Sequence, residues 1–457
     1  MFNKKKEHQV SHLYLNYGFL GLATLIKNSG NNVSFYQGEL FSPMDLIDYL
    51  VKHYHNIDEK IIFISIPSFF AVTWGREFIQ LVRKKLNSKI IMGGRWVLSN
   101  KKWALKEYAD VDVIVNGQAE GIIEDLLVGK NNVKKPFYID AASTKGMGVF
   151  KEFDYQLLYD FKKFSPCIEI SRGCGYGCEF CADKDVPLTA LKAPEGIINE
   201  ILDVNNVYGE DDLKFYFQAS IFYPTKAWIE EFHKLFVQSK LKSQWRCETR
   251  ADINLKEENI KLLSLSGLKV IDIGLESGSP IQLKRMQKTN KAKNYLDKAH
   301  ELMRHCHKYG IWVKVNILLY PGETYNTINE TIKFLESNKK YIKGLSVYPT
   351  LIYGSDQHAL NFLSEIDKYG ASALNGRIEE TGITYLNLSS EITFEDAKLL
   401  SVNIPKLFMT QEDYFDLKSF SYFPRGYKYN AFIKHISNIK QENLPFKLSD
   451  RTTNEPL

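Results

Sequence analysis

Residues 167–181 read CIEISRGCGYGCEFC, a short strand pattern that runs directly into a loop with three cysteines. These cysteines, Cys174, Cys178 and Cys181, have the spacing C-x3-C-x2-C. Glycines at positions 173, 175 and 177 permit the backbone angles that a tightly wrapped loop requires. The stretch therefore predicts a strand whose end turns several thiol side chains toward one point.

A regular alternation of strand and helix patterns continues from this stretch. The strand patterns cover residues 167–171, 213–218, 244–250, 270–274, 312–319 and 345–348. The helical patterns between them cover residues 194–207, 226–239, 257–265, 292–309 and 325–337. Strands separated by helices imply right-handed crossovers and a parallel sheet.

Polar residues occupy alternate positions of these strands. They are Glu169, Ser171, Lys214, Tyr216, Gln218, Arg246, Glu248, Arg250, Asp272, Lys314, Asn316, Ser346 and Tyr348. A parallel sheet covered by helices on both faces is apolar throughout, so one face here lines a polar space. We expect a partial, six-strand TIM-type barrel with a polar lumen; an amphipathic sheet with a solvated face is the alternative.

A second, smaller α/β series precedes the barrel. Strand patterns at residues 61–66, 89–94 and 111–115 alternate with helical patterns at 75–86 and 120–127. Gly93 and Gly94 end the second strand, where they permit either a close ligand or a plain turn. We therefore expect an N-terminal Rossmann-like parallel sheet.

The expected division of the chain has four parts. They are a Rossmann-like domain at 1–128, a polar linker at 129–160, the barrel at 161–355 and an α-rich C-terminal cap and tail at 356–457. Within the cap, residues 392–410 predict a helix and residues 419–429 are rich in aromatic side chains.

The composition is that of a folded protein with more than one domain. Of its 457 residues, 44% are hydrophobic and 25% are charged, which argues against disorder. A net charge of +5 is too mild for a nucleic-acid-binding surface. Because neither a signal peptide nor a membrane-spanning stretch is apparent, we expect a cytoplasmic protein with no membrane partner. In that reducing compartment, clustered cysteines are more often metal ligands than disulfides.

The cysteine loop has two metal interpretations. Three thiolates can hold three irons of a cubane cluster and leave the fourth iron open. Structural zinc instead requires four protein ligands, for which Cys167 is the available candidate. A third interpretation is that the cysteines only pack.

The loop, with the aromatic Phe180 before its last cysteine, resembles the signature of the radical S-adenosylmethionine (SAM) superfamily. The resemblance implies a 4Fe-4S cluster on Cys174, Cys178 and Cys181, with SAM on the open iron. It further implies reductive cleavage of SAM to a 5′-deoxyadenosyl radical that modifies substrate. An electron donor such as flavodoxin or ferredoxin is implied as a partner.

Further segments resemble the cobalamin-associated branch of this superfamily. They are WRCETR at 245–250, GLESGS at 274–279, YPGET at 320–324, YGFLGLATL at 17–25 and NGQAE at 116–120. By this resemblance Arg250, Glu276 and Ser277 lie near the carboxylate and ribose of SAM. An ion pair between Arg250 and Glu276 is the plainer alternative. Gln218 stands where the family usually has an acidic residue, and its amide oxygen can accept from the SAM amine.

Cobalamin itself remains an open expectation. The chain lacks an Asp-x-His-x-x-Gly motif, and a vestigial fold used for substrate docking is the rival interpretation. The expected reaction modifies an unactivated carbon of a peptide or small natural product, by C-methylation if cobalamin is bound. The alternatives are cobalamin-independent hydrogen abstraction, as in peptide epimerisation, and a non-catalytic zinc-stabilised binding module.

The other reactive side chains have structural interpretations. Strand parity places Cys247 toward the helices, so we expect a packed thiol rather than a hydrogen-atom donor. His305, Cys306 and His307 are adjacent on a helix and do not share a face, which argues against a metal site. Tyr216 and Tyr348 are expected to line the lumen.

Overall fold

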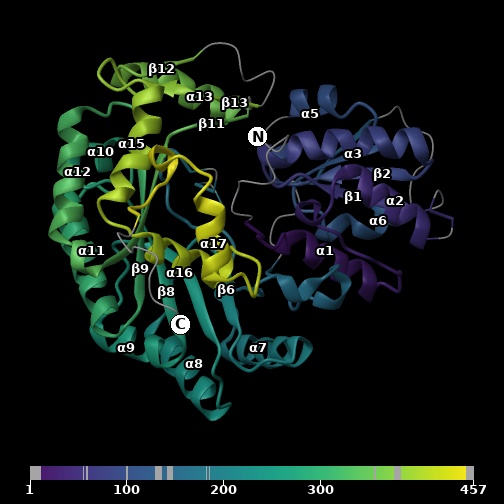
Figure 1. The fold of residues 1–457 in the computed structure, drawn as a ribbon, viewed down its shortest axis with the longest axis horizontal. Helices are drawn as coiled ribbons and strands as arrows, with labels where there is room; N and C mark the ends of the chain where they lie inside the picture. The colour runs from purple at the N-terminus through teal and green to yellow at the C-terminus, as the bar shows by residue number, and fades with distance from the viewer. Residues whose placement is uncertain are drawn as a thin grey trace.

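Two parallel sheets organise the chain, and they lie side by side in the computed structural model (Figure 1). The structure describes residues 12–448, except residues 55, 58–59, 99–100, 129–135, 142–147, 182, 185, 355–356 and 375–381. No helix of this described part is both long and apolar enough to cross a membrane.

The N-terminal sheet has four parallel strands in the order β1-β2-β3-β4. They are β1 (Ile61–Ser65), β2 (Lys89–Gly93), β3 (Val113–Asn116) and β4 (Phe137–Asp140). One face packs on α2 (Pro43–His53), α3 (Val72–Lys85), α4 (Arg95–Leu98) and α5 (Lys101–Glu107). The other packs on α1 (Tyr17–Asn28) and α6 (Ile123–Val128). The Rossmann-like expectation is confirmed.

Strand β4 lies inside the stretch expected to be a linker. It pairs in parallel with β3, with Val113 opposite Phe137, and so forms the edge of the sheet. Its pattern is weak because the strand is four residues long and no residue of it is buried. The N-terminal sheet therefore extends to Asp140, beyond the boundary expected at residue 128.

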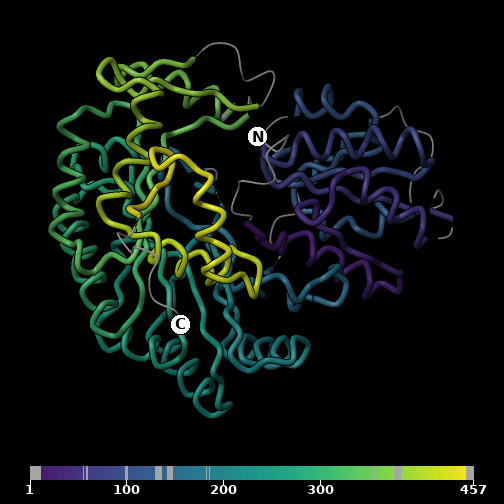
Figure 2. Tube along the Cα trace, viewed as in Figure 1, coloured from purple at the N-terminus to yellow at the C-terminus, as the bar shows by residue number. Residues whose placement is uncertain are grey.

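The second sheet is the expected six-strand partial barrel. Its parallel strands follow the order of the chain: β5 (Cys167–Glu169), β6 (Lys214–Gln218), β7 (Gln244–Arg250), β8 (Leu268–Glu276), β9 (Trp312–Leu319) and β10 (Ile342–Pro349). The connecting helices are α7 (Pro194–Tyr208), α8 (Lys226–Gln238), α9 (Glu257–Leu265), α10 (Pro280–Arg285), α11 (Ala292–Lys308) and α12 (Tyr325–Ser337). They form an outer crescent in the tube view (Figure 2).

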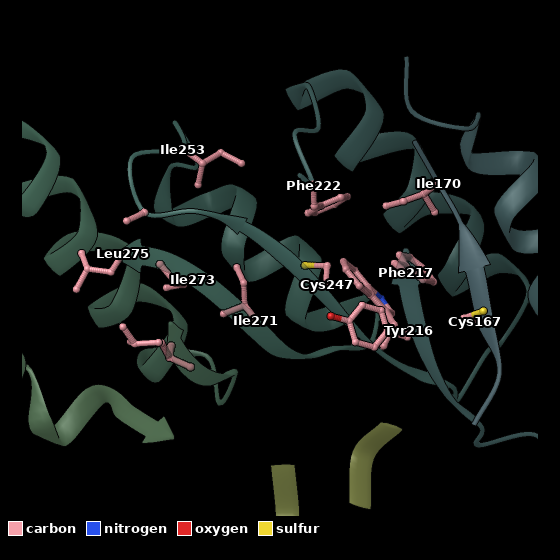
Figure 3. Close-up of a cluster of buried hydrophobic side chains, with 14 of the residues drawn as sticks. Cys167, Ile170, Tyr216, Phe217, Phe222, Cys247, Ile253, Ile271, Ile273 and Leu275 are labelled. Carbon is pink, nitrogen blue, oxygen red and sulfur yellow. The ribbon is translucent and has the colours of Figure 1, made fainter. Parts of the chain in front are cut away.

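The face of the barrel sheet that meets the helices is apolar, as parity predicts. Cys247 pairs in register with Ile271, and both side chains are fully buried. Figure 3 shows this core, with Cys247 between Phe217 and Ile271. Burying one such large side chain contributes about 2 kcal/mol, so this face supplies much of the stability of the barrel. Arg246, next to Cys247, points to the opposite, lumen face.

The C-terminal region contains the expected helices. They are α13 (Gln357–Ile366), α15 (Phe394–Lys406), α16 (Gln411–Ser421) and α17 (Tyr429–Ile436). Two small antiparallel pairs join β11 (Ile352–Tyr353) to β13 (Ile383–Thr384) and β12 (Ser372–Ala373) to β14 (Leu386–Asn387). The aromatic side chains of residues 419–429 pack with α16 and α17 in a separate core.

Helix α16 and the beginning of the described chain together cover the open side of the barrel. Helix α16 contacts both β6 and β10. The Leu13 N–H donates to the Tyr422 carbonyl at 2.6 Å, and the Tyr14 ring stacks on the Tyr422 ring. Since among the described strands β5 pairs only with β6 and β10 only with β9, these segments take the place of further strands.

Candidate active site at the carboxyl ends of the barrel strands

The cysteine loop follows β5 and folds back on its own return segment. The Cys174 and Gly175 N–H groups donate to the Val186 carbonyl at 3.1 and 3.2 Å. Gly173 has a φ of +72°, and a Cβ there would lie 2.0 Å from the Pro187 carbonyl oxygen. Glycine at 173 is therefore required by the turn that brings the cysteines together.

Three free thiols are exposed to different extents on this loop. Cys178 is buried, whereas Cys174 and Cys181 are partly exposed. The Asp183 N–H lies 3.4 Å from the Cys181 Sγ, and an Arg250 N–H lies 3.4 Å from the Cys178 Sγ. Burial raises the pKa of the Cys181 thiol, and the Asp183 N–H opposes that shift. The Asp183 N–H thus favours the thiolate of Cys181, which is the form that binds iron.

The described part of the cysteine loop does not form a site for a single metal ion. Within the described residues, no three His, Cys, Asp or Glu side chains converge as ligands of a single metal ion. A cubane cluster makes a different demand, because each thiolate binds its own iron. Cys167 is buried in β5, where its backbone N–H donates to the Tyr155 hydroxyl at 2.9 Å.

Arg250 holds the loop from the end of β7. Its Nε and Nη2 lie 2.9 and 3.3 Å from the Asp252 carboxylate oxygens, and Nη2 also donates to the Lys288 carbonyl at 2.8 Å. The guanidinium lies 4.0 Å from the centre of the Tyr176 ring. Most of its donors are thus engaged by the protein itself, and Arg250 positions Cys178 and Tyr176.

Glu276 ends β8, and its ion-pair partner is Lys288 rather than Arg250. Its φ is +66°, and its Oε1 lies 3.1 Å from the Lys288 Nζ. The ion pair between Arg250 and Glu276 is therefore wrong: Arg250 pairs with Asp252, and Glu276 pairs with Lys288. Lys288 connects the two groups through its carbonyl and its ammonium, and no motif had indicated it.

Gln218, Phe180 and Ser277 have separate surroundings. The Gln218 Nε2 donates to the Tyr14 hydroxyl at 2.6 Å, and the Phe180 ring lies edge-on to Tyr320 with centroids 6.4 Å apart. The Ser277 hydroxyl lies 3.1 Å from the Thr331 hydroxyl and accepts from the Ser279 N–H at 3.0 Å. Ser277 thus ties the end of β8 to α12.

The remaining candidates are structural. Cys306 is fully buried, while His305 lies 3.4 Å from a Glu257 oxygen and the His307 ring packs on Tyr341. These three neighbours on α11 therefore face different groups.

Two ion pairs set the N-terminal sheet against the cysteine loop. Arg95, directly after β2, lies 2.9 Å from Asp183. Arg172, between β5 and Cys174, lies 2.8 Å from Glu120, which follows β3. The carboxyl ends of the N-terminal strands therefore face the loop that carries the cysteines.

Gly94, in the glycine pair at the end of β2, is required by a turn of the backbone. Gly94 has a φ of +108°, and a Cβ there would lie 2.6 Å from the Ile66 backbone nitrogen and oxygen. The Trp96 N–H then donates to the Ile66 carbonyl at 3.0 Å. Gly94 thus allows β1 and β2 to end close together.

Comparison with known proteins gives one family match. Residues 168–335 match the family model described as the radical SAM superfamily. The bacteriochlorophyllide d C-12(1)-methyltransferase of Chlorobaculum tepidum is 24% identical over 237 residues, which cover 50% of each chain. The hopanoid C-2 methylase of Rhodopseudomonas palustris is 28% identical over 194 residues, 40% of this chain and 36% of that protein. The chain thus spans half or less of the length of these curated relatives.

Two solved structures share the fold over most of this chain. The radical SAM methyltransferase TsrM from Kitasatospora setae, with cobalamin and a [4Fe-4S] cluster bound, has a TM-score of 0.66 and 15% identity over 88% of this chain and 87% of that one. The cobalamin-dependent SAM radical enzyme OxsB, with aqua-cobalamin bound, has a TM-score of 0.58 and 19% identity over 78% of this chain and 54% of that one. At these identities the likeness is one of fold.

Proposed function

Because residues 168–335 belong to the radical SAM superfamily, we propose that this protein is a cobalamin-dependent radical SAM methyltransferase acting on an unactivated carbon of a peptide or small natural product. The superfamily implies a 4Fe-4S cluster, SAM and an electron donor, for which flavodoxin or ferredoxin is the proposed class. The match of residues 168–335 to the radical SAM superfamily argues against the non-catalytic zinc-stabilised module.

One observation carries the cobalamin part of the proposal. The ion pairs of Arg95 with Asp183 and of Arg172 with Glu120 bring the carboxyl ends of the N-terminal strands to the cysteine loop. Ligands of open α/β sheets bind at the carboxyl ends of the strands. A corrinoid held there would lie next to the cluster and SAM, as methyl transfer between them requires.

The bound groups supply the difficult chemistry: reductive cleavage of SAM at the cluster, and a transferable methyl group on cobalamin. Cys174, Cys178 and Cys181 would hold the cluster. Arg250 places one N–H 3.4 Å from the Cys178 Sγ and keeps the loop in place through the Lys288 carbonyl. Lys288 pairs with Glu276 at 3.1 Å and holds this carboxylate at the end of β8, where it could accept from sugar hydroxyls.

The proposal is tested by anaerobic incubation of the reconstituted protein with reductant and SAM carrying a deuterated methyl group. Formation of 5′-deoxyadenosine and S-adenosylhomocysteine, together with a corrinoid absorbance of the purified protein, is the expected result. Formation of 5′-deoxyadenosine alone, with no corrinoid bound after reconstitution, would contradict methyl transfer and favour hydrogen abstraction, as in an epimerase.

A further inference from the structure

A cavity of about 280 Å³ lies in the barrel lumen away from the cysteine loop. It is bounded by β9 and β10 on one side and by α15 and α16 on the other, the helices that cover this side of the sheet (Figure 1). Arg246 lines it four residues before Arg250 on the same strand, a separation of about 13 Å along β7. The cavity is thus distinct from the candidate active site.

The charged side chains that line this cavity are all cationic. Arg246, Lys314 and Lys418 all line it. Asp272 accepts from Arg246 Nη2 at 2.7 Å and lies 3.0 Å from the Lys314 Nζ. Burial alone would raise the pKa of Asp272, but these two cations hold it at about 2. One firmly ionised carboxylate is therefore shared between two cations.

Lys418 on α16 is the third cation, and the described residues offer it no carboxylate within ion-pair distance. Its ammonium lies 4.7 Å from the centre of the Tyr422 ring and 5.5 Å from that of Tyr414. Burial, with the charges of Lys314 and Arg246, lowers the pKa of Lys418 to about 7. The surroundings of Lys418 thus disfavour its charged form, which an anion bound beside it would favour.

The other titratable groups around the cavity do not supply the missing negative charge. Glu248 accepts from the Tyr216 hydroxyl, and burial and the charge of Asp272 raise the pKa of Glu248. Burial lowers the pKa of His12 to about 4, so this ring is neutral near pH 7. A buried cation without a partner is costly, and a bound anion would remove that cost.

The geometry points to a binding site for a small organic carboxylate with an apolar body. The Lys418 ammonium would hold the carboxylate, and Lys314, which also lines the cavity, would add positive charge. Val402, Pro405 and Met409 form an apolar wall suited to the rest of the ligand. Tyr348, 60% exposed, lies in the lining and opens the cavity to the surface. An apolar wall beside a single unpaired cation fits a monocarboxylate better than a hydrophilic phosphate.

Equilibrium dialysis of the full-length protein with labelled phenylacetate tests this site. The measurement is made without SAM, so it does not depend on the proposed methyl transfer. We expect saturable binding that unlabelled phenylacetate displaces and that phenylacetamide, its uncharged analogue, does not. Replacing Lys418 by Met removes one charge-assisted contact and should weaken binding about tenfold or more.

Two variants separate loss of the site from loss of the fold. Lys418→Arg keeps the charge and should keep binding, while Lys398→Met removes an exposed lysine of α15 that pairs with Glu395 and should change nothing. Without ligand, Lys418→Met should unfold at the same or a higher temperature than the parent, because it removes an uncompensated charge. If phenylacetate does not bind, if phenylacetamide or inorganic phosphate competes equally, or if Lys418→Met and Lys418→Arg bind alike, the inference is wrong.

Discussion

The two ends of the barrel lumen are built from the same strands but hold their arginines differently. Toward its carboxyl end, β7 presents Arg250, whose donors reach Cys178 and a loop carbonyl as well as Asp252. Earlier on the same strand, Arg246 is fully buried against Asp272 and against the Leu417 carbonyl of α16. One polar stripe thus supports a cofactor loop at one end and an internal ion cluster at the other.

The largest expected difference between the two ends concerns iron binding and the cleavage of SAM. Cys178→Ala should abolish iron binding by the reconstituted protein and the cleavage of SAM, because it removes one of three thiolates. Iron and sulfide content, with chromatography of 5′-deoxyadenosine, measures both. Cys247→Ala is the matched control on the apolar face of β7 and should retain iron. A Cys178→Ala protein with full iron content would remove the distinction between the ends.

Breaking the Arg246–Asp272 ion pair at the inner end of the lumen should lower the free energy of unfolding. Arg246→Met leaves Asp272 with a single cation in a site where both side chains are 0% exposed, and we expect a loss of about 3–5 kcal/mol of unfolding free energy. Urea denaturation measures this change. The control is Lys226→Ala, which breaks an exposed pair with Glu230 and should cost less than about 0.5 kcal/mol. Equal costs would show that Arg246 contributes no more than a surface residue.

Acid should weaken the same inner cluster. The native pKa of Asp272, about 2, lies below its ordinary value of 3.8. A lowered pKa contributes stability that is complete above pH 3.8 and is lost as the pH falls toward 2. The contribution is about 2 kcal/mol. The difference in unfolding free energy between the parent and Asp272→Asn should therefore shrink over that range, and a constant difference would contradict the assignment.

Arg250 should show a smaller effect at the cofactor end. Since it acts on Cys178 through one N–H and on the loop through Lys288, Arg250→Gln should lower the rate of SAM cleavage about tenfold. The loss of its pair with Asp252 should lower the urea midpoint less than Arg246→Met does. Electron paramagnetic resonance of the reduced cluster should report an altered environment. A variant that cleaves SAM at the parental rate would show that Cys178 is positioned without Arg250.

The smallest effect is expected at the contact between the two sheets. Arg95 is 66% exposed in its pair with Asp183, so Arg95→Ala should cost less than about 1 kcal/mol. Arg172 is 13% exposed and pairs with both Glu169 and Glu120, so Arg172→Ala should cost more. Thermal unfolding of the two variants measures the order, and the reverse order would place the main interdomain contact at Arg95.

The regular parts of the fold were predictable because their periodicity is strong. The helices at Glu257–Leu265 and Tyr325–Ser337 and the strand at Trp312–Leu319 begin and end where the sequence predicts. Strand β4 was missed, since a short edge strand with no buried residue lacks an alternating pattern.

The site was predictable only where its residues are neighbours in sequence. The cysteine loop carries its own spacing, Arg250 ends a predicted strand, and Glu276 lies two residues after the end of another. Their partners could not be predicted: Lys288 lies 38 residues after Arg250, and Tyr14 lies 204 residues before Gln218. Such contacts depend on how loops and the N-terminal segment meet the barrel, which no local pattern records.

The junction of Leu13 with Tyr422 also bears on the order in which the protein folds. The two residues lie near opposite ends of the described chain, so this contact has a very large sequence separation and forms late. During synthesis the barrel strands emerge long before α16 does. The open edge of the barrel therefore stays uncovered on the ribosome until the C-terminal helices arrive, which makes that edge the surface most exposed to wrong pairing and to chaperones.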